Sequence, residues 1–230
     1  MSCMADQVSR PYMNHHPERQ LWVKKFIDET VASLLFIILS PLIGGIALLL
    51  WVTMGRPLLF RQKRSGLNGR PFQIIKFRTM TDEHDSSGRA LPDEMRLTAV
   101  GRFLRATSLD ELPELWNVIR GELSLVGPRP LMARYLERYS AEQARRHEVM
   151  PGITGWAQIN GRNDLLWEQK FALDIWYADN WSLGLDFRIL VKTFWRVLKR
   201  DCICPRDHVS VPEFMGNGSL GESERPLQCK

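Results

Sequence analysis

The sequence lacks several features that would point to a common class of protein. Its 230 residues include only four cysteines, Cys3, Cys202, Cys204 and Cys229, which stand near the chain ends and form no C-x-x-C pair. Neither a disulfide-framed secreted fold nor a zinc site is indicated. The P-loop motif G-x-x-x-x-G-K-[ST], H-E-x-x-H, G-x-S-x-G and the D-x-D metal motif are also absent. None of the enzyme classes that these motifs mark is indicated.

Charged residues are missing from one long stretch, residues 30–55. As a helix this run would reach ~39 Å, whereas the hydrocarbon core of a bilayer is ~30 Å thick. A mean hydropathy of −0.22 for the whole chain conceals it. A signal peptide is disfavoured because the run begins far from the N-terminus, and a core helix of this kind would need a larger domain to cover it. The run predicts membrane insertion.

The topology of this segment has two interpretations. Positive residues flank the run on both sides, and positive flanks mark the cytoplasmic side of a membrane segment. Ser40-Pro41 lies near the middle of the run, where proline removes a backbone donor and a serine hydroxyl can satisfy a freed carbonyl. A re-entrant hairpin broken at Ser40-Pro41 is slightly favoured over a kinked spanning helix.

The remaining pattern predicts an α+β, mainly helical chain with four segments: a tail at 1–23, a membrane anchor at 24–56, a small cytoplasmic catalytic domain at 57–208 and a flexible tail at 209–230. A strand is expected at 72–78, and a polar surface loop at 81–92. Helices are expected at 97–105, 108–120, 135–149, 167–180 and 186–200.

The last of these helices is cationic and amphipathic. Its apolar residues include aromatics and alternate with Arg and Lys, which is typical of a helix in the interface of an anionic membrane, although a surface helix packed on the core fits equally well. The surplus of 31 Lys and Arg over 26 Asp and Glu could suggest a nucleic-acid partner. No nucleic-acid motif accompanies it, so none is expected.

A candidate site begins at Ser108-Leu109-Asp110-Glu111-Leu112. Ser108 and Glu111 have the spacing of a capping box at a helix start, which leaves Asp110 unexplained. Adjacent helical residues point ~100° apart, so Asp110 and Glu111 could serve as nucleophile and as acid-base or metal partner. Pro128 and Pro130 hold Arg129 in a rigid turn suited to phosphate contacts, and Arg105 lies just upstream.

These pieces together make the chain recognisable. It resembles the monotopic phosphoglycosyl transferases, bacterial enzymes that begin glycan assembly at membranes, over about residues 24–208. The motifs that carry the resemblance are Ser40-Pro41, Lys76-Phe77-Arg78-Thr79-Met80, Ser108-Leu109-Asp110-Glu111-Leu112, Val126-Gly127-Pro128-Arg129-Pro130 and Pro151-Gly152-Ile153-Thr154-Gly155-Trp156-Ala157-Gln158. The short branch that loads N,N′-diacetylbacillosamine phosphate is the most similar, through residues 81–85 and 199–209.

The resemblance implies a reaction and a set of roles. A sugar-1-phosphate would pass from a UDP-sugar to undecaprenyl phosphate with release of UMP and with Mg²⁺, at the bacterial inner membrane with the catalytic domain facing the cytoplasm. Asp110 would be the nucleophile and Glu111 its partner, both near the metal. Phosphate and substrate contacts are expected from Arg105, Arg129, Lys76, Arg78, Arg162, Asp174 and Asp186.

Two alternatives remain open at this stage. A membrane-anchored scaffold would not need Asp110 or Glu111, and the residues themselves do not distinguish a diacetamido sugar from galactose, glucose or N-acetylgalactosamine. Downstream glycosyltransferases are possible partners of such an enzyme.

Overall fold

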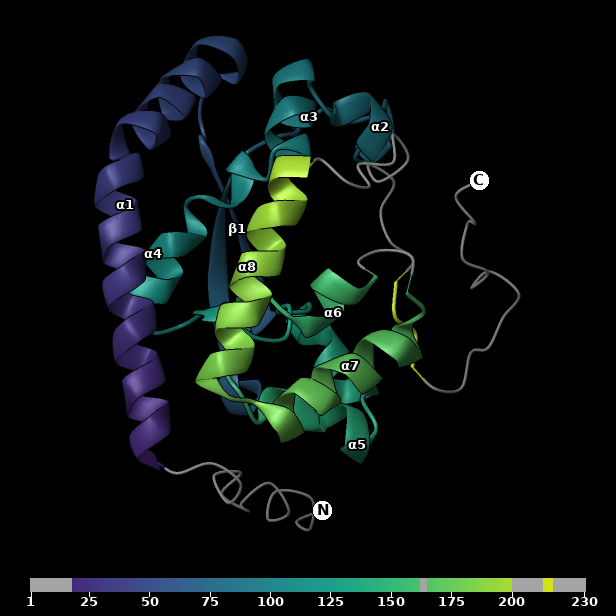
Figure 1. The fold of residues 1–230 in the computed structure, drawn as a ribbon. Coiled ribbons are helices and arrows are strands. Elements are labelled where there is room, and N and C mark those ends of the chain that lie inside the picture. Colours follow the sequence, from purple (N-terminus) through teal and green to yellow (C-terminus); the bar gives the residue numbers. More distant parts are fainter. Residues whose placement is uncertain (1–17, 162–164, 200–212, 217–230) are drawn as a thin grey trace.

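The computed structural model of the chain describes residues 18–161, 165–199 and 213–216 (Figure 1). These residues form a helix-rich α+β structure, as predicted. In chain order the elements are α1 (Glu18–Met54), β1 (Leu59–Ser65), η1 (Leu67–Gly69), β2 (Pro71–Phe77), α2 (Asp93–Arg96), α3 (Ala99–Ala106), η2 (Leu109–Glu111), α4 (Glu114–Ile119), β3 (Ser124–Val126), η3 (Ala133–Arg138), α5 (Ala141–Ala144), η4 (Arg145–His147), β4 (Gly152–Thr154), α6 (Trp156–Asn160), α7 (Trp167–Asn180) and α8 (Leu183–Lys199).

The charge-free run lies inside α1, one continuous helix that is long and apolar enough to cross a membrane. The expected break at Ser40-Pro41 does not interrupt it. Pro41 deprives the carbonyl of Ile37 of its usual amide donor, and the hydroxyl of Ser40 donates to that carbonyl instead, at 2.7 Å. The helix changes direction along its length and leans over the rest of the molecule (Figure 1).

Both halves of α1 pack against the same domain. In the N-terminal half, Ala32 is buried in the main hydrophobic cluster with Leu115, Val118 and Ile189. In the C-terminal half, Leu50 is buried in a second cluster with Leu104. The opposite side of α1 exposes large apolar side chains, among them Trp22, Phe26, Leu34, Ile37, Ile38, Leu48, Trp51 and Val52.

Two small sheets frame the domain. β1 and β2 form an antiparallel hairpin, and β3 and β4 form a parallel pair. Because side chains alternate along a strand, the hairpin has two different faces. One face carries the cross-strand pairs Arg61–Ile75 and Lys63–Gln73, and the other carries Phe60–Lys76 and Gln62–Ile74.

The predicted elements are confirmed to different degrees. The strand at 72–78 and the helix at 167–180 correspond to β2 and α7, and the helices at 97–105 and 186–200 correspond to α3 and α8 within three residues at each described end. The expected helix at 108–120 is divided into η2 and α4 because Ser108 has a positive φ of 55°. The expected helix at 135–149 is three short pieces, η3, α5 and η4.

Part of the expected C-terminal tail is packed. Phe214 is buried among Tyr135, Tyr139 and Phe171, and the carboxylate of Glu213 pairs with two arginines of η3. Burial of one aromatic ring with a salt-bridged neighbour fixes residues 213–216 inside a range that its Gly, Ser and Pro content predicts to fray.

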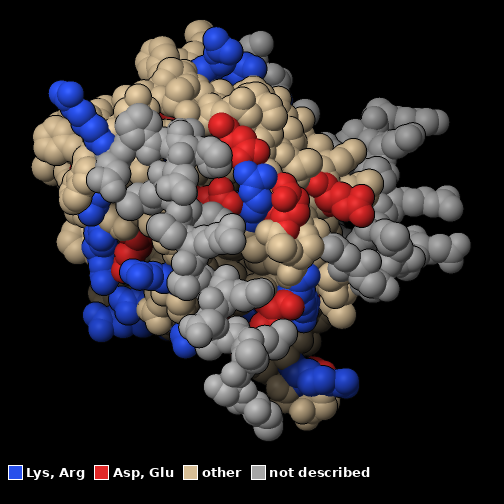
Figure 2. Space-filling view, turned by 90° about the horizontal axis from the view of Figure 1, so that it is seen from below, with Lys and Arg blue, Asp and Glu red and all other residues tan. Residues whose placement is uncertain are grey.

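Charge and apolar surface are separated on the outside of the molecule. The amphipathic character of α8 is confirmed, since Phe187, Phe194 and Trp195 are all more than half exposed. On the face seen in Figure 2, Lys and Arg gather along one edge while Asp and Glu lie nearer the middle.

Candidate active site

The segment with Asp110 and Glu111 has an irregular backbone. It follows α3, contains the 3₁₀ turn η2, and precedes α4. Ser108 takes the left-handed conformation at φ 55° and makes no side-chain capping bond, so the predicted capping box is absent. A non-glycine residue in that region carries backbone strain, which is often retained where a site must be held in place.

Glu111 is turned away from the helix start and into a cluster of charges. Its Oε1 lies 2.6 Å from Nζ of Lys76 on β2 and 2.7 Å from Nη2 of Arg129. Nζ of Lys76 also lies 3.0 Å from Oε1 of Glu114, which is 2% exposed. We call Lys76, Asp110, Glu111, Glu114 and Arg129 the carboxylate cluster.

The three carboxyl groups of this cluster differ in protonation. Burial opposes ionisation of Glu111, but the charges of Arg129 and Lys76 outweigh it and hold its pKa far below the usual range. Burial and the charge of Glu111 raise the pKa of Glu114 to about 7, and the same two causes raise the pKa of Asp110 to about 6. The negative charge of Glu111 also raises the pKa of Arg129.

Asp110 stands out because it makes no hydrogen bond or ion pair to another described residue. Lys76, Arg105 and Arg129 nevertheless act on it electrostatically and favour its ionised form. A half-buried carboxylate that faces three cations without being bound by any of them is available to an incoming group.

Arg105 is positioned by the segment after β2. Its Nε donates to the hydroxyl of Thr79 at 2.9 Å. The helix that carries it approaches this segment closely, because a Cβ added at Gly101 would lie 1.9 Å from the carbonyl oxygen of Thr79. The motif at 76–80 thus supplies Lys76 to the cluster and a support for Arg105.

Arg129 is positioned by the contact between the two glycine-containing motifs. A Cβ on Gly127 would lie 2.1 Å from the carbonyl of Met150, and one on Gly152 would lie 2.0 Å from the amide of Gly127. Only glycine allows the two backbones to come this close. The loop that presents Arg129 is thereby pressed against the residues around β4.

A buried ion pair also holds the loop that carries Arg129. Asp174 of α7 accepts hydrogen bonds from Nε and Nη2 of Arg146, at 3.0 and 2.7 Å, and Nη2 of Arg146 also donates to the carbonyl of Arg129 at 2.7 Å. Asp174 is therefore linked to the carboxylate cluster through Arg146 and the backbone of Arg129.

The other predicted substrate-binding residues have different surroundings. Arg78 donates to the carbonyls of Met80 and Pro57 and pairs with Asp82. Asp186 lies 2.5 Å from Nζ of Lys24 and accepts from the hydroxyl of Tyr177 and the indole of Trp181. Arg162 lies outside the described residues.

Asp186 belongs to a second group of charges, which joins α1 to the domain. Lys24 also lies 3.3 Å from Asp28, and the hydroxyl of Ser124 donates to Asp28 at 2.6 Å. We call Lys24, Asp28, Ser124, Tyr177 and Asp186 the anchor cluster.

The carboxylates could contribute to a metal site only together with a ligand. Among residues 18–161, 165–199 and 213–216, no group of three or more His, Cys, Asp and Glu is arranged to hold a metal ion. Mg²⁺ is commonly bound by one or two carboxylates together with phosphate oxygens of a substrate. The free carboxyl of Asp110 and the second oxygen of Glu111 fit that mode of binding.

The motif search missed two residues of the site, Glu114 and Arg146, and only Glu114 has a signal in the sequence. Glu114 follows Glu111 by three positions, the spacing that places two side chains on the same helical face. Arg146 has no local signal, because its partners Asp174 and Arg129 are distant in the sequence.

Comparison with known proteins shows the family of the chain. The sequence profile described as bacterial sugar transferase matches residues 19–200. The chain is 52% identical over 198 residues to a Bacillus subtilis protein named "Uncharacterized sugar transferase EpsL", covering 86% of this chain and 98% of the relative.

The relatives whose names state a reaction are longer than this chain. A UDP-glucose:undecaprenyl-phosphate glucose-1-phosphate transferase of Klebsiella pneumoniae is 41% identical over 75% of this chain, which covers 39% of the relative. An undecaprenyl-phosphate galactose phosphotransferase of Salmonella typhimurium is 38% identical over 78% of this chain and is covered to 41%. The chain spans about two fifths of the length of these two relatives.

Proposed function

The chain belongs to the bacterial sugar transferase family, and on that premise we propose that it transfers a sugar-1-phosphate from a UDP-sugar to undecaprenyl phosphate, releasing UMP. The name of the Klebsiella relative contains a UDP-sugar donor and this acceptor, and the name of the Salmonella relative contains the acceptor. The observation that carries the proposal is the unbound carboxyl of Asp110 beside a Glu111 held by Lys76 and Arg129.

The proposed reaction has two displacements at one phosphorus. A carboxylate oxygen of Asp110 attacks the phosphorus that bears the sugar, the bond from that phosphorus to the bridging oxygen breaks, and UMP leaves with the electron pair. A phosphate oxygen of undecaprenyl phosphate then attacks the same phosphorus, and the carboxylate of Asp110 departs. One covalent site thus serves a soluble donor and a lipid acceptor in turn.

The surrounding cations reduce the charge repulsion that opposes the first step. A carboxylate must approach phosphate oxygens that are already negative, and the repulsion falls when positive groups flank the path. Arg129 is 47% exposed beyond its contact with Glu111, so its guanidinium can also meet a phosphate. Arg105, which lies on α3, adds positive charge that acts electrostatically on Asp110.

Glu111 acts in this proposal as a positioning group for the cations. Its charge fixes Lys76 and Arg129 at the mouth of the site, and these two residues come from segments that are more than fifty positions apart in the chain. If Mg²⁺ binds, Asp110 and Glu111 would hold it with the donor phosphates, and it would supply further charge neutralisation.

The membrane arrangement that we propose is re-entrant, with the catalytic domain at the cytoplasmic face of the inner membrane. Lys24 and Leu50 are separated by 26 positions, or ~39 Å of straight helix, yet both are buried against the same domain. A perpendicular span would put ~30 Å of hydrocarbon between them. The exposed apolar side of α1 and the aromatic side of α8 would instead enter one leaflet.

The identity of the donor sugar is the most specific part of the proposal. The resemblance to the diacetylbacillosamine branch and the glucose and galactose in the names of the relatives give three donors to compare. We propose that the donor is a UDP-hexose or UDP-amino-hexose, and the panel below selects among them.

The test uses the purified full chain in detergent with undecaprenyl phosphate, Mg²⁺ and UDP-glucose, UDP-galactose, UDP-N-acetylgalactosamine or UDP-N,N′-diacetylbacillosamine. We expect UMP release with one donor to exceed that with the others, and without acceptor a donor labelled in the sugar should leave about one label per protein. UMP release without label retention would contradict the covalent step. Failure of every donor to yield UMP would favour the scaffold alternative.

A further inference from the structure

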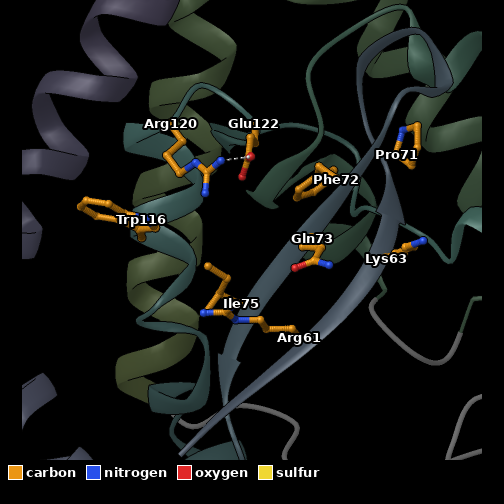
Figure 3. Close-up of a pocket in the computed structure, with 9 residues that line it drawn as sticks. All are labelled: Arg61, Lys63, Pro71, Phe72, Gln73, Ile75, Trp116, Arg120 and Glu122. Atoms are coloured by element: carbon orange, nitrogen blue, oxygen red, sulfur yellow. Dashed lines mark ion pairs between the residues drawn. The ribbon is translucent and has the colours of Figure 1, made fainter.

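A second charged pocket lies on the opposite face of the β1–β2 hairpin from the carboxylate cluster. It has a volume of about 400 Å³ and is lined by Arg61, Lys63, Pro71, Phe72, Gln73, Ile75, Trp116, Arg120 and Glu122 (Figure 3). The cross-strand pairs Arg61–Ile75 and Lys63–Gln73 lie on this face, whereas Lys76 projects from the other toward Glu111. We call this space the hairpin pocket.

The lining of the hairpin pocket carries an excess of positive charge. Arg61 and Lys63 are exposed and make no ion pair with another described residue, and Arg120 shares its charge with Glu122 at 3.2 Å. Three cations therefore face a single carboxylate. Guanidinium groups with free donors bind phosphate oxygens with two parallel hydrogen bonds.

The pocket also lies beside α1. Its apolar residue Trp116 is near an apolar part of α1, and its charged residue Arg120 is near a charged part of that helix. Trp116 stands 5.8 Å from Phe36, between ring centroids, and Phe36 is in the charge-free run. At the other end, a Cβ on Gly121, the residue after Arg120, would lie 3.2 Å from Oε1 of Glu29, which belongs to the charged start of α1. Figure 3 shows Trp116 extending from α4 toward the ribbon of α1.

This gradient matches an amphipathic ligand. A phosphate bound by Arg120 would sit near the charged start of α1, with Arg61 at the opposite end of the pocket (Figure 3), and an attached acyl chain would lie along Trp116 and Phe36, where α1 is apolar. Basic pockets beside membrane helices recognise lipid head groups in this way.

We propose that the hairpin pocket binds the phosphate of an anionic phospholipid of the surrounding leaflet, at a site separate from the carboxylate cluster. A lipid phosphate on this face of the hairpin is shielded by β2 from Asp110, so it is not in line to react. The lipid would hold β1, β2 and α4 at a fixed depth relative to α1. The inference rests on α1 lying in a membrane and not on the transfer reaction.

The experiment measures lipid retention by the full chain in neutral detergent, using native mass spectrometry with equimolar short-chain phosphatidylglycerol and phosphatidylcholine. We expect one retained phosphatidylglycerol, preferred by roughly tenfold over phosphatidylcholine on the basis of two cation contacts. The double variant Arg61→Gln with Arg120→Gln should lose that preference. The variant Arg89→Gln with Arg102→Gln removes the same charge at two other exposed positions and should keep it.

Three results would overturn the inference. Unchanged retention in Arg61→Gln with Arg120→Gln would show that the pocket is not the binding site. Displacement of phosphatidylglycerol by equimolar undecaprenyl phosphate would assign the pocket to the acceptor, and displacement by glycerol phosphate at the same concentration would assign it to soluble phosphates. Because Asp110→Asn should retain the lipid fully, the outcome is independent of whether any UDP-sugar releases UMP.

Discussion

The carboxylate cluster and the anchor cluster both bring together charged side chains from distant parts of the chain, yet their bonding differs. In the anchor cluster, Lys24 lies between Oδ2 of Asp28 and Oδ2 of Asp186. The hydroxyl of Ser124 and the indole of Trp181 donate to these same two oxygens, and the hydroxyl of Tyr177 donates to Oδ1 of Asp186. In the carboxylate cluster, three carboxyl groups share two cations, and Asp110 is bound by neither.

The difference separates charges that hold the structure from charges that can react. A buried ion pair whose partners are all satisfied has no capacity left for a ligand, and its removal leaves an unpaired charge. A carboxyl with a raised pKa and no partner is costly to keep and is characteristic of functional sites. We expect substitutions in the two clusters to affect different measurements.

Asp110→Asn should have the largest effect and should act on catalysis alone. The amide cannot form the covalent bond, so transfer should fall about ten-thousandfold or more, equivalent to ~5 kcal/mol in the barrier. The unfolding midpoint should stay within ~2 °C, because no bond to a described residue is lost. UMP release and thermal unfolding measure the two effects, and Asp179→Asn, a change at an exposed ion pair with Arg145, is the control.

Asp186→Ala should reverse this pattern. Lys24 would lose one of its two carboxylates, and Tyr177 and Trp181 would lose their hydrogen bonds to Asp186, so the free energy of unfolding should fall by about 3–5 kcal/mol. Denaturant unfolding in detergent measures the loss, with Asp179→Ala as the exposed control. If Asp186→Ala instead left stability unchanged and stopped transfer, Asp186 would be a substrate ligand, as the family resemblance implied.

His147 provides a test outside both clusters. Burial, reinforced by the charge of Arg146, lowers its pKa to about 4, below the 6.5 of an ordinary histidine. The unfolded chain then binds the proton more readily, so stability is lost as pH falls from about 6.5 to 4, by about 3 kcal/mol. His147→Gln should remove that part of the acid sensitivity. Equal pH dependence in both proteins would mean that the imidazole is hydrated in the folded state.

Glu111→Gln should have a smaller effect on catalysis than loss of the nucleophile. An amide oxygen can still accept from Lys76 and Arg129 but without charge assistance, so transfer should fall about thirtyfold, or ~2 kcal/mol. Glu114→Gln is the matched comparison, because the pKa of Glu114 is already raised to about 7 and its carboxyl is often neutral. We expect only about a threefold loss there, and a larger loss than in Glu111→Gln would place Glu114 nearer the chemistry.

The sequence predicted the local elements well where one physical signal dominates. The charge-free run lies within α1, although the break expected at Ser40-Pro41 is absent, and the helix expected at 167–180 is α7 with the same bounds. The pairing of Asp110 and Glu111 with Arg129 was also predicted in outline, although the distances and the protonation of the three carboxyls depend on burial, which a motif does not state.

The sequence was misleading where local and tertiary preferences compete. Ser108 and Glu111 satisfy the pattern of a capping box, but Glu111 gains two charge-assisted contacts by turning to Lys76 and Arg129 instead. Phe214 likewise lies in a segment of polar composition, and its burial against Tyr135, Tyr139 and Phe171 comes from residues that precede it by more than forty positions.

By itself, the sequence determined that this protein has an apolar anchor, a mainly helical domain and an acidic pair with nearby arginines, because these follow from composition and short-range spacing. The tertiary structure alone decided that Asp186 holds the anchor in place and that Asp110 is left unbound. It also decided that the two faces of one hairpin carry different charged sites. Such properties depend on which distant side chains meet and how far water is excluded from them, and neither is encoded in any single stretch of residues.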